Sequence, residues 1–186
     1  MAQGVTTRRR RGKRRQSKNE KSTFHTWAKF LVVFALLFLV GSKFHQLTRE
    51  RTATILVDAL NAQPSAALIN LVTPSEHARA IRNLIQGRTN ILVGQGCDGL
   101  DCLLLLVSAM LAFPMVARKK AIGIAIGVPL LYGCNLLRIT GLYYVQRHCP
   151  QYFQFMHVNV GQTFIIVVGC GFFLLFTGSL AREQRV

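Results

Sequence analysis

The chain has 186 residues, of which 51% are hydrophobic and only 16% are charged, against roughly 25% charged residues in a soluble domain. This composition, with a mean hydropathy of +0.31, excludes an ordinary soluble protein. The net charge of +16 would be typical of a nucleic-acid-binding protein, but nine of the 23 Lys and Arg residues lie between Arg8 and Lys21. The composition therefore predicts a membrane protein with a basic tail.

Residues 1–26 are predicted to form a disordered cytoplasmic tail. Its basic residues are interleaved with Gly, Gln, Ser and Asn, so the segment cannot bury enough apolar surface to fold. Such a tail attracts anionic membrane lipids. Nucleic-acid binding is disfavoured, because no folded basic face with aromatic stacking platforms accompanies the charge.

The first apolar run, residues 27–41, can be extended to residue 44 and predicts a transmembrane helix over 27–44. A basic segment followed by an apolar one is also typical of a signal peptide. The long tail and the lack of a small-x-small cleavage site after Val40 favour an uncleaved helix.

Residues 45–96 are predicted to be extracytoplasmic and to contain no span. Residues 48–63 are expected to form an amphipathic helix on the membrane surface, and the apolar run 66–72 is too short to cross.

Two short apolar runs, 80–85 and 89–93, flank a turn that contains Gly87 and indicate a β-hairpin. The alternative is a single helix over 74–85, because Thr73-Pro74-Ser75-Glu76 is a helix-start signal.

Three further apolar runs, 100–117, 121–144 and 160–180, complete a bundle of about four transmembrane helices. The third run contains small and polar residues suited to packing between helices, among them Gly123, Gly127, Pro129, Gly133 and Asn135. The predicted fold class is an all-α integral membrane protein with a small extracytoplasmic insertion, in which residues 97–180 form the core.

The orientation follows from the basic residues near the helix ends, since cytoplasmic flanks carry the excess of Lys and Arg. The tail, the Arg118-Lys119-Lys120 run and the C-terminal residues 181–186 then all lie in the cytoplasm. We therefore expect a multi-pass protein of the plasma (inner) membrane, with residues 45–96 and 145–159 outside.

This topology brings Cys97, Arg138 and His157 to the extracytoplasmic face. Cys97 precedes the second helix and His157 precedes the fourth, while Arg138 lies 18 residues beyond Lys120, about 27 Å along the third helix. Ionisable groups at membrane depth are costly and usually have a role. The three residues are predicted to form one site.

A thiol, an imidazole and a guanidinium are a set suited to acyl transfer without a metal or other cofactor. Cys97, near a positive helix start, would be the thiolate nucleophile. His157 would take the thiol proton and later protonate the leaving amine. Arg138 would stabilise the oxyanion or hold a substrate carboxylate.

Two neighbouring acids leave an alternative open. Asp98 and Asp101 would cap the second helix in an Asp-x-x-Asp arrangement. Their charges oppose formation of a thiolate at Cys97 unless a base such as Arg138 pairs with them.

Cys149 and His148 offer competing interpretations. A Cys97–Cys149 disulfide is possible in an oxidising compartment, and His148 beside Cys149 is a rival Cys/His pair, although adjacent residues rarely present both groups to one substrate. A metal site from His148, Cys149 and His157 lacks a recognisable ligand spacing. Three cysteines are interpreted as apolar packing residues, namely Cys102, Cys134 and Cys170.

The strings Gly96-Cys97-Asp98-Gly99-Leu100, Asn135-Leu136-Leu137-Arg138 and Met156-His157 resemble the exosortase/archaeosortase family, in the same order over residues 88–180. The resemblance implies a polytopic membrane cysteine transpeptidase, sortase-like in role but unrelated in fold. It also implies Cys97 as nucleophile, with Arg138 and His157 as second and third catalytic residues. The chain is shorter than members with about eight spans and is similar to the compact ones.

The expected function is cleavage of C-terminal sorting signals, which consist of a short motif, a transmembrane helix and a basic tail, through an acyl-thioester at the outer face. Transfer to an amine and hydrolysis both remain open. The expected partners are membrane-anchored substrate proteins and membrane lipids. The alternative is a non-enzymatic assembly factor or small-solute carrier, in which Arg138 is a structural or substrate-binding charge.

Overall fold

The computed structural model describes residues 25–48, 54–94, 97 and 99–183. The predicted tail, residues 1–26, lies outside these ranges except for its last two residues, which are already helical. Asp98 also lies outside them.

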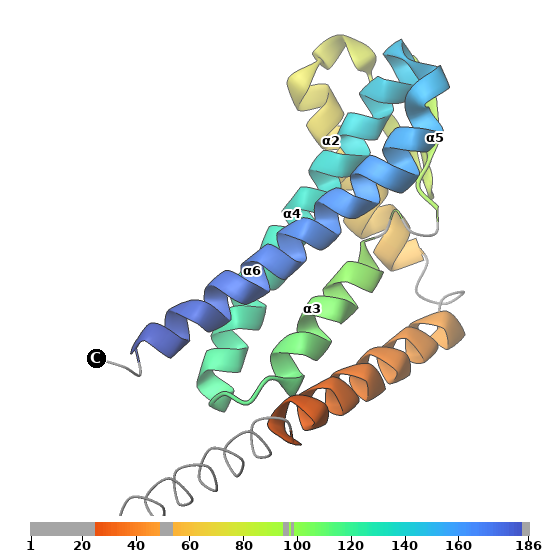
Figure 1. Ribbon diagram of the computed structural model, residues 1–186. Coiled ribbons are helices and arrows are strands. Elements are labelled where there is room, and N and C mark those ends of the chain that lie inside the picture. The colour runs from red at the N-terminus through yellow and green to blue at the C-terminus, as the bar shows by residue number, and fades with distance from the viewer. Residues whose placement is uncertain (1–24, 49–53, 95–96, 98, 184–186) are drawn as a thin grey trace, which may run out of the picture.

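Helices form the body of the molecule (Figure 1), in the order N-terminal helix His25–Thr48, α3 Leu100–Ala112, α4 Ala117–His148 and α6 Gly161–Glu183. Within the described residues, three helical stretches are long and apolar enough to cross a membrane, namely His25–Thr48, Ala117–His148 and Pro150–Ser179. The predicted fold class, a helical integral membrane protein, is confirmed. We call the end with the α3–α4 connection and Lys119 the basic end, and the opposite end, which carries a small sheet, the sheet end.

The second predicted span, residues 100–117, is shorter than expected. α3 begins at Leu100 but ends at Ala112 after 13 residues, which is about 20 Å. Phe113 is extended, with φ −66° and ψ 136°, because the ring of Pro114 disfavours helical backbone in the residue before it. α3 alone therefore falls short of a hydrocarbon core of roughly 30 Å.

Glycines on α4 let the neighbouring helices approach closely, as the sequence predicts. A Cβ atom on Gly127 would lie 2.6 Å from Phe172 of α6 and 2.7 Å from Leu106 of α3. One turn earlier, a Cβ on Gly123 would lie 2.8 Å from Phe176. Since real Cβ atoms do not approach this closely, larger residues here would push α4 away from both partners.

The N-terminal helix packs against α3 and α6 near the basic end. The ring of Phe30 meets Phe113 edge to face with centroids 5.9 Å apart, and it stacks on Phe173 at 6.4 Å. Phe113 and Phe173 also contact each other at 5.6 Å. This aromatic cluster joins three elements that are far apart in the sequence.

The segment between the N-terminal helix and α3 folds at the sheet end. Its elements are η1 Thr54–Ala62, α2 Gln63–Val72, η2 Pro74–Glu76, β1 Arg79–Ile81, β2 Leu84–Gln86 and β3 Asn90–Leu92. The strands form one antiparallel sheet in the order β1-β2-β3.

The predicted hairpin is therefore present, with an additional strand, and the alternative helix over residues 74–85 is wrong. Pro74 starts only a single 3-10 turn, which ends at His77 in the left-handed conformation. Arg82 is also left-handed, with φ 54°, and its turn separates β1 from β2.

The sheet is fixed against α4 by apolar and polar contacts. Ile85 and Ile91 lie in one buried cluster with Ile139 and Tyr143 of α4. The Tyr143 hydroxyl donates to Glu76 Oε2 at 2.7 Å. Arg147, one turn further along α4, forms an ion pair with Oε1 of the same carboxylate. The charges of Glu76 and Arg147 thus compensate each other at the sheet end.

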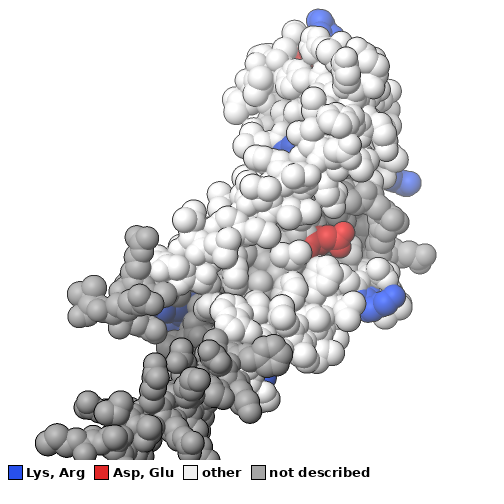
Figure 2. Space-filling view, viewed as in Figure 1, with Lys and Arg blue, Asp and Glu red and all other residues white. Residues whose placement is uncertain are grey.

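The face of the bundle shown in Figure 2 is largely uncharged. Large apolar side chains are exposed along the long helices, among them Leu31, Leu36, Val40, Ile122, Ile126, Val167 and Leu174. An apolar surface of this extent is suited to contact with lipid tails. The protein is therefore a multi-pass membrane protein.

Candidate active site

Cys97 and His157 are brought into direct contact although 60 residues separate them. The Cys97 sulfur lies 2.7 Å from Nε2 of His157. Cys97 follows β3 and precedes α3, and its side chain is buried. A thiol in hydrogen-bonding contact with an imidazole can pass its proton to the ring and become a thiolate.

His157 is presented by an irregular stretch at the start of the last helix. It lies in a π-helical turn, η4 Met156–Val160, which leads into α6. Its ring stacks on Phe153 with centroids 5.8 Å apart and an interplanar angle of 24°. Short π-helical turns inside helices are frequent at functional sites, and here the turn and the Phe153 ring hold the imidazole beside the thiol.

Arg138 reaches the same place from α4. Its Nη2 atom donates to the backbone carbonyl of His157 at 3.2 Å, and the residue is only 8% exposed. The three predicted residues are therefore neighbours at the sheet end of the bundle, although they come from three separate segments.

Gly161, at the start of α6, makes room for the guanidinium. A Cβ on this glycine would lie 2.6 Å from Arg138 Nε and 3.1 Å from the Met156 carbonyl oxygen. No other residue type can therefore occupy this position without moving Arg138.

We expect Gly161→Ala to lower any activity that depends on Arg138 by about a hundredfold, the loss that can follow from misplacing a reacting group by about 1 Å. The control is Gly171→Ala in the same helix, where a Cβ would meet no atom within 4 Å. Activity per inserted protein and thermal unfolding in detergent are measured for both. Equal activity of the two variants would contradict the assignment.

Asn135 is a site residue that the sequence points to only as a packing residue and as part of a family string. Its Nδ2 atom donates to the Cys97 carbonyl oxygen and to Asn61 Oδ1, both at 2.9 Å. Gly99 is left-handed, with φ 70°, and a Cβ there would lie 2.8 Å from Asn135 Cγ. The buried amide thus fixes the backbone of Cys97, and the glycine leaves space for it.

The structure also locates the residues that offered alternatives to the Cys97, Arg138 and His157 site. Cys149 and Cys97 are both free thiols, and the His148 ring stacks on Tyr144 with centroids 6.5 Å apart.

Asp101 is exposed and, among the described residues, forms no ion pair with Arg138. Gly99 occupies the N-cap position of α3; the predicted Asp-x-x-Asp cap depends on Asp98, which lies outside the described residues. Within the described ranges no group of three His, Cys, Asp or Glu side chains could hold a metal ion.

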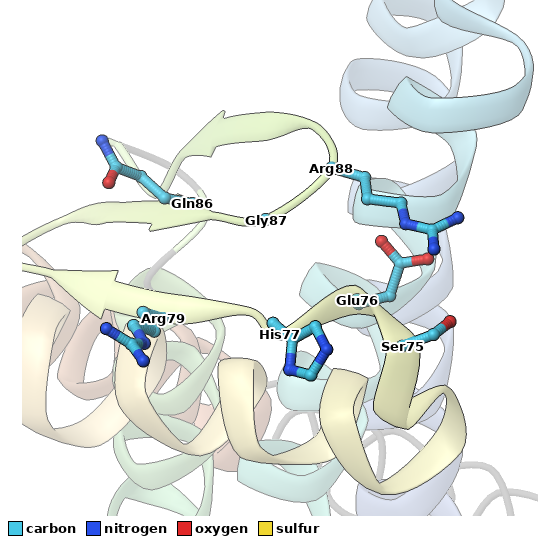
Figure 3. Close-up of a pocket in the computed structure, with 7 residues that line it drawn as sticks. All are labelled: Ser75, Glu76, His77, Arg79, Gln86, Gly87 and Arg88. Carbon is cyan, nitrogen blue, oxygen red and sulfur yellow. The ribbon is translucent and has the colours of Figure 1, made fainter.

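A cavity of about 480 Å³ lies beside Glu76 (Figure 3), lined by Ser75, Glu76, His77, Arg79, Gln86, Gly87 and Arg88. Arg88 extends from the β2–β3 turn towards the carboxylate of Glu76. The same carboxylate is bound by Tyr143, which is eight residues, or about 12 Å, beyond Asn135 along α4. The cavity is therefore separate from the thiol, and none of Cys97, Arg138 and His157 lines it.

Comparison with known proteins identifies the family. The model of a family described as transmembrane exosortase matches residues 19–176, which is most of the chain. No curated protein and no solved structure gives a significant match. The matched range includes every residue of the Cys97, Arg138 and His157 site. The chain therefore belongs to the transmembrane exosortase family, whose membership suggests a membrane protease or transpeptidase.

Proposed function

We propose that the protein is a membrane cysteine protease or transpeptidase that cleaves C-terminal sorting signals through an acyl-thioester. The observation that carries this proposal is the 2.7 Å contact between the Cys97 sulfur and His157 Nε2. A membrane protein has little structural reason to bring a thiol and an imidazole from distant segments together beside a buried guanidinium. Nucleophilic catalysis is a direct reason.

In the first half-reaction, His157 takes the thiol proton as the Cys97 sulfur attacks the carbonyl carbon of the scissile peptide. The tetrahedral intermediate carries a negative oxygen, and Arg138 stabilises this charge in a site from which water is largely excluded. When the carbon–nitrogen bond breaks, His157 returns the proton to the leaving amine. The N-terminal part of the substrate remains attached to Cys97 as a thioester.

In the second half-reaction, a nucleophile attacks the thioester carbon and the thiol is restored. An amine acceptor gives transpeptidation, and water gives hydrolysis. His157 takes a proton from either acceptor as the new bond forms and returns it to the departing Cys97 thiolate.

The substrate is a protein with a short motif, a transmembrane helix and a basic tail at its C-terminus. Its helix enters the bundle from the side through the lipid, and its basic tail remains on the same side as Lys119 and Lys120. The sheet end then faces outward, both termini are cytoplasmic, and the scissile peptide meets Cys97 on the outer side of the bilayer.

The acyl-enzyme provides the test. A reporter fused to a sorting signal from the same genome is co-expressed with the protein, the reaction is stopped in acid, and adducts are mapped by mass spectrometry. We expect a hydroxylamine-sensitive adduct on Cys97, and the new C-terminus of the released product identifies the acceptor. Reporter cleavage without an adduct would contradict the acyl-thioester route, and no cleavage by the inserted protein would favour a carrier or an assembly factor instead.

A further inference from the structure

The sheet has an open edge beside the candidate active site. β3 is the last strand of the sheet and pairs only with β2 among the described strands. In the sequence, Cys97 follows the end of β3 by five residues and precedes α3.

Two residues of β3 direct their backbone polar groups to the open edge. The Val93 N–H donates to the Asn83 carbonyl at 2.7 Å, which identifies these two as a hydrogen-bonded pair. Bonded and non-bonded pairs alternate in an antiparallel ladder. Leu92, opposite Leu84, is thus a non-bonded position, and so is Asn90. Their N–H and C=O groups point away from β2.

Within the described residues, no hydrogen bond reaches the N–H or C=O of Asn90 or Leu92. Leu92 is 63% exposed and Asn90 is also exposed. Natural sheets protect open edges with charged residues, prolines or bulges, but the sequence from Thr89 to Val93 contains no charged residue and no proline.

The direction and length of the edge fit one kind of occupant. The segment that contains β3 begins after Gly87, which lies beside Tyr143, and leads to Cys97, which lies beside Asn135 and is five residues beyond the end of β3. It therefore descends about 12 Å along α4, a distance that about four residues of extended chain would cover. A substrate chain that runs from an outer domain to its own transmembrane helix travels in the same direction.

We propose that the substrate segment just before the scissile peptide adds to the sheet as a strand parallel to β3, and this inference rests on the proposed function above. Its backbone pairs with the N–H and C=O groups of Asn90 and Leu92, as extended peptides do on other sheet edges. The added strand delivers the next peptide bond to Cys97. Backbone hydrogen bonds to β3 then hold the motif in an extended conformation, and contacts of its side chains provide sequence specificity.

The first test places a proline on each edge of the sheet. Leu92→Pro removes an N–H from the open edge and breaks no bond to β2, because that N–H faces outward. The matched control is Ala80→Pro, whose N–H faces the opposite edge by the same alternation. The substrate is the reporter that wild-type protein cleaves in a Cys97-dependent way, and Cys97 alkylation by iodoacetamide reports whether the site is intact.

We expect Leu92→Pro to lower reporter cleavage about tenfold or more, mainly through a higher KM, with Cys97 alkylation unchanged and with Ala80→Pro close to wild type. Equal cleavage by the two variants would overturn strand addition while leaving the peptidase intact. A wild-type protein without Cys97-dependent cleavage would overturn the proposed function and this inference with it.

A second measurement does not depend on how well the proline variant folds. Leu92→Cys in a Cys97→Ser background is paired with single cysteines scanned through the reporter's motif. Disulfides should form at alternate positions over about four residues, with the period of two of a β-strand. Crosslinks between two copies of Leu92→Cys, or none to the reporter, would overturn the substrate strand.

Discussion

We expect Cys97→Ser to abolish reporter processing, with a fall of at least about a thousandfold, while the protein still inserts and accumulates. Serine keeps the size of the side chain but its hydroxyl is a far weaker nucleophile, and the neighbouring His157 cannot compensate for this difference. The rate of product formation per inserted protein is followed by gel shift, with the new C-terminus identified by mass spectrometry.

The matched control for this prediction is Cys102→Ser. Cys102 lies near the start of α3 and packs against the apolar cluster of Leu106 and Met110, so its loss should leave processing near the wild-type rate. If Cys97→Ser processes the reporter as fast as Cys102→Ser at equal protein levels, Cys97 is not the nucleophile.

We expect Arg138→Lys to lower the rate of processing by about a hundredfold to a thousandfold, the loss seen when one oxyanion donor is removed from an enzyme. Lysine keeps the charge but replaces a planar fork with a single point charge. It therefore cannot hold the His157 carbonyl, which Arg138 Nη2 contacts at 3.2 Å, and also face a developing oxyanion. The measurement is single-turnover acylation of Cys97, because the predicted defect lies in the chemical step.

Arg147→Lys is the control on the same helix. Arg147 pairs with Glu76, about 14 Å along α4 from Arg138, and lysine can keep that ion pair. A loss of acylation in Arg147→Lys as large as that in Arg138→Lys would indicate that both substitutions act by destabilising the bundle.

The helices could be predicted from the sequence because hydropathy and length decide them. The start of α3 at Leu100 is correct to the residue. The predicted end of the third helix, at residue 144, falls four residues short of the observed His148. The extra turn is polar and carries no hydropathy signal, and Arg147 is held there by Glu76, which lies in a segment that is distant in the sequence.

The details of the site depend on tertiary contacts that no local pattern contains. Cys97, Arg138 and His157 can be assigned to one membrane face by counting residues along helices. By contrast, Asn135 bonds partners that are 38 and 74 residues away. The β1–β2 turn was missed because it uses a left-handed Arg82 in place of the Gly or Asn that usually indicates such a turn.

The short α3 gives the site a defined depth. If the basic end lies at one boundary of a hydrocarbon core of roughly 30 Å, a helix of about 20 Å ends some 10 Å below the other. Under the proposed function, Cys97 then meets its substrate beneath the bilayer surface, where an unfolded soluble peptide would have to give up the water that binds its backbone. A peptide that is already anchored in the membrane reaches the depth of Cys97 without this dehydration cost. The depth of Cys97 therefore favours membrane-anchored substrates over soluble peptides.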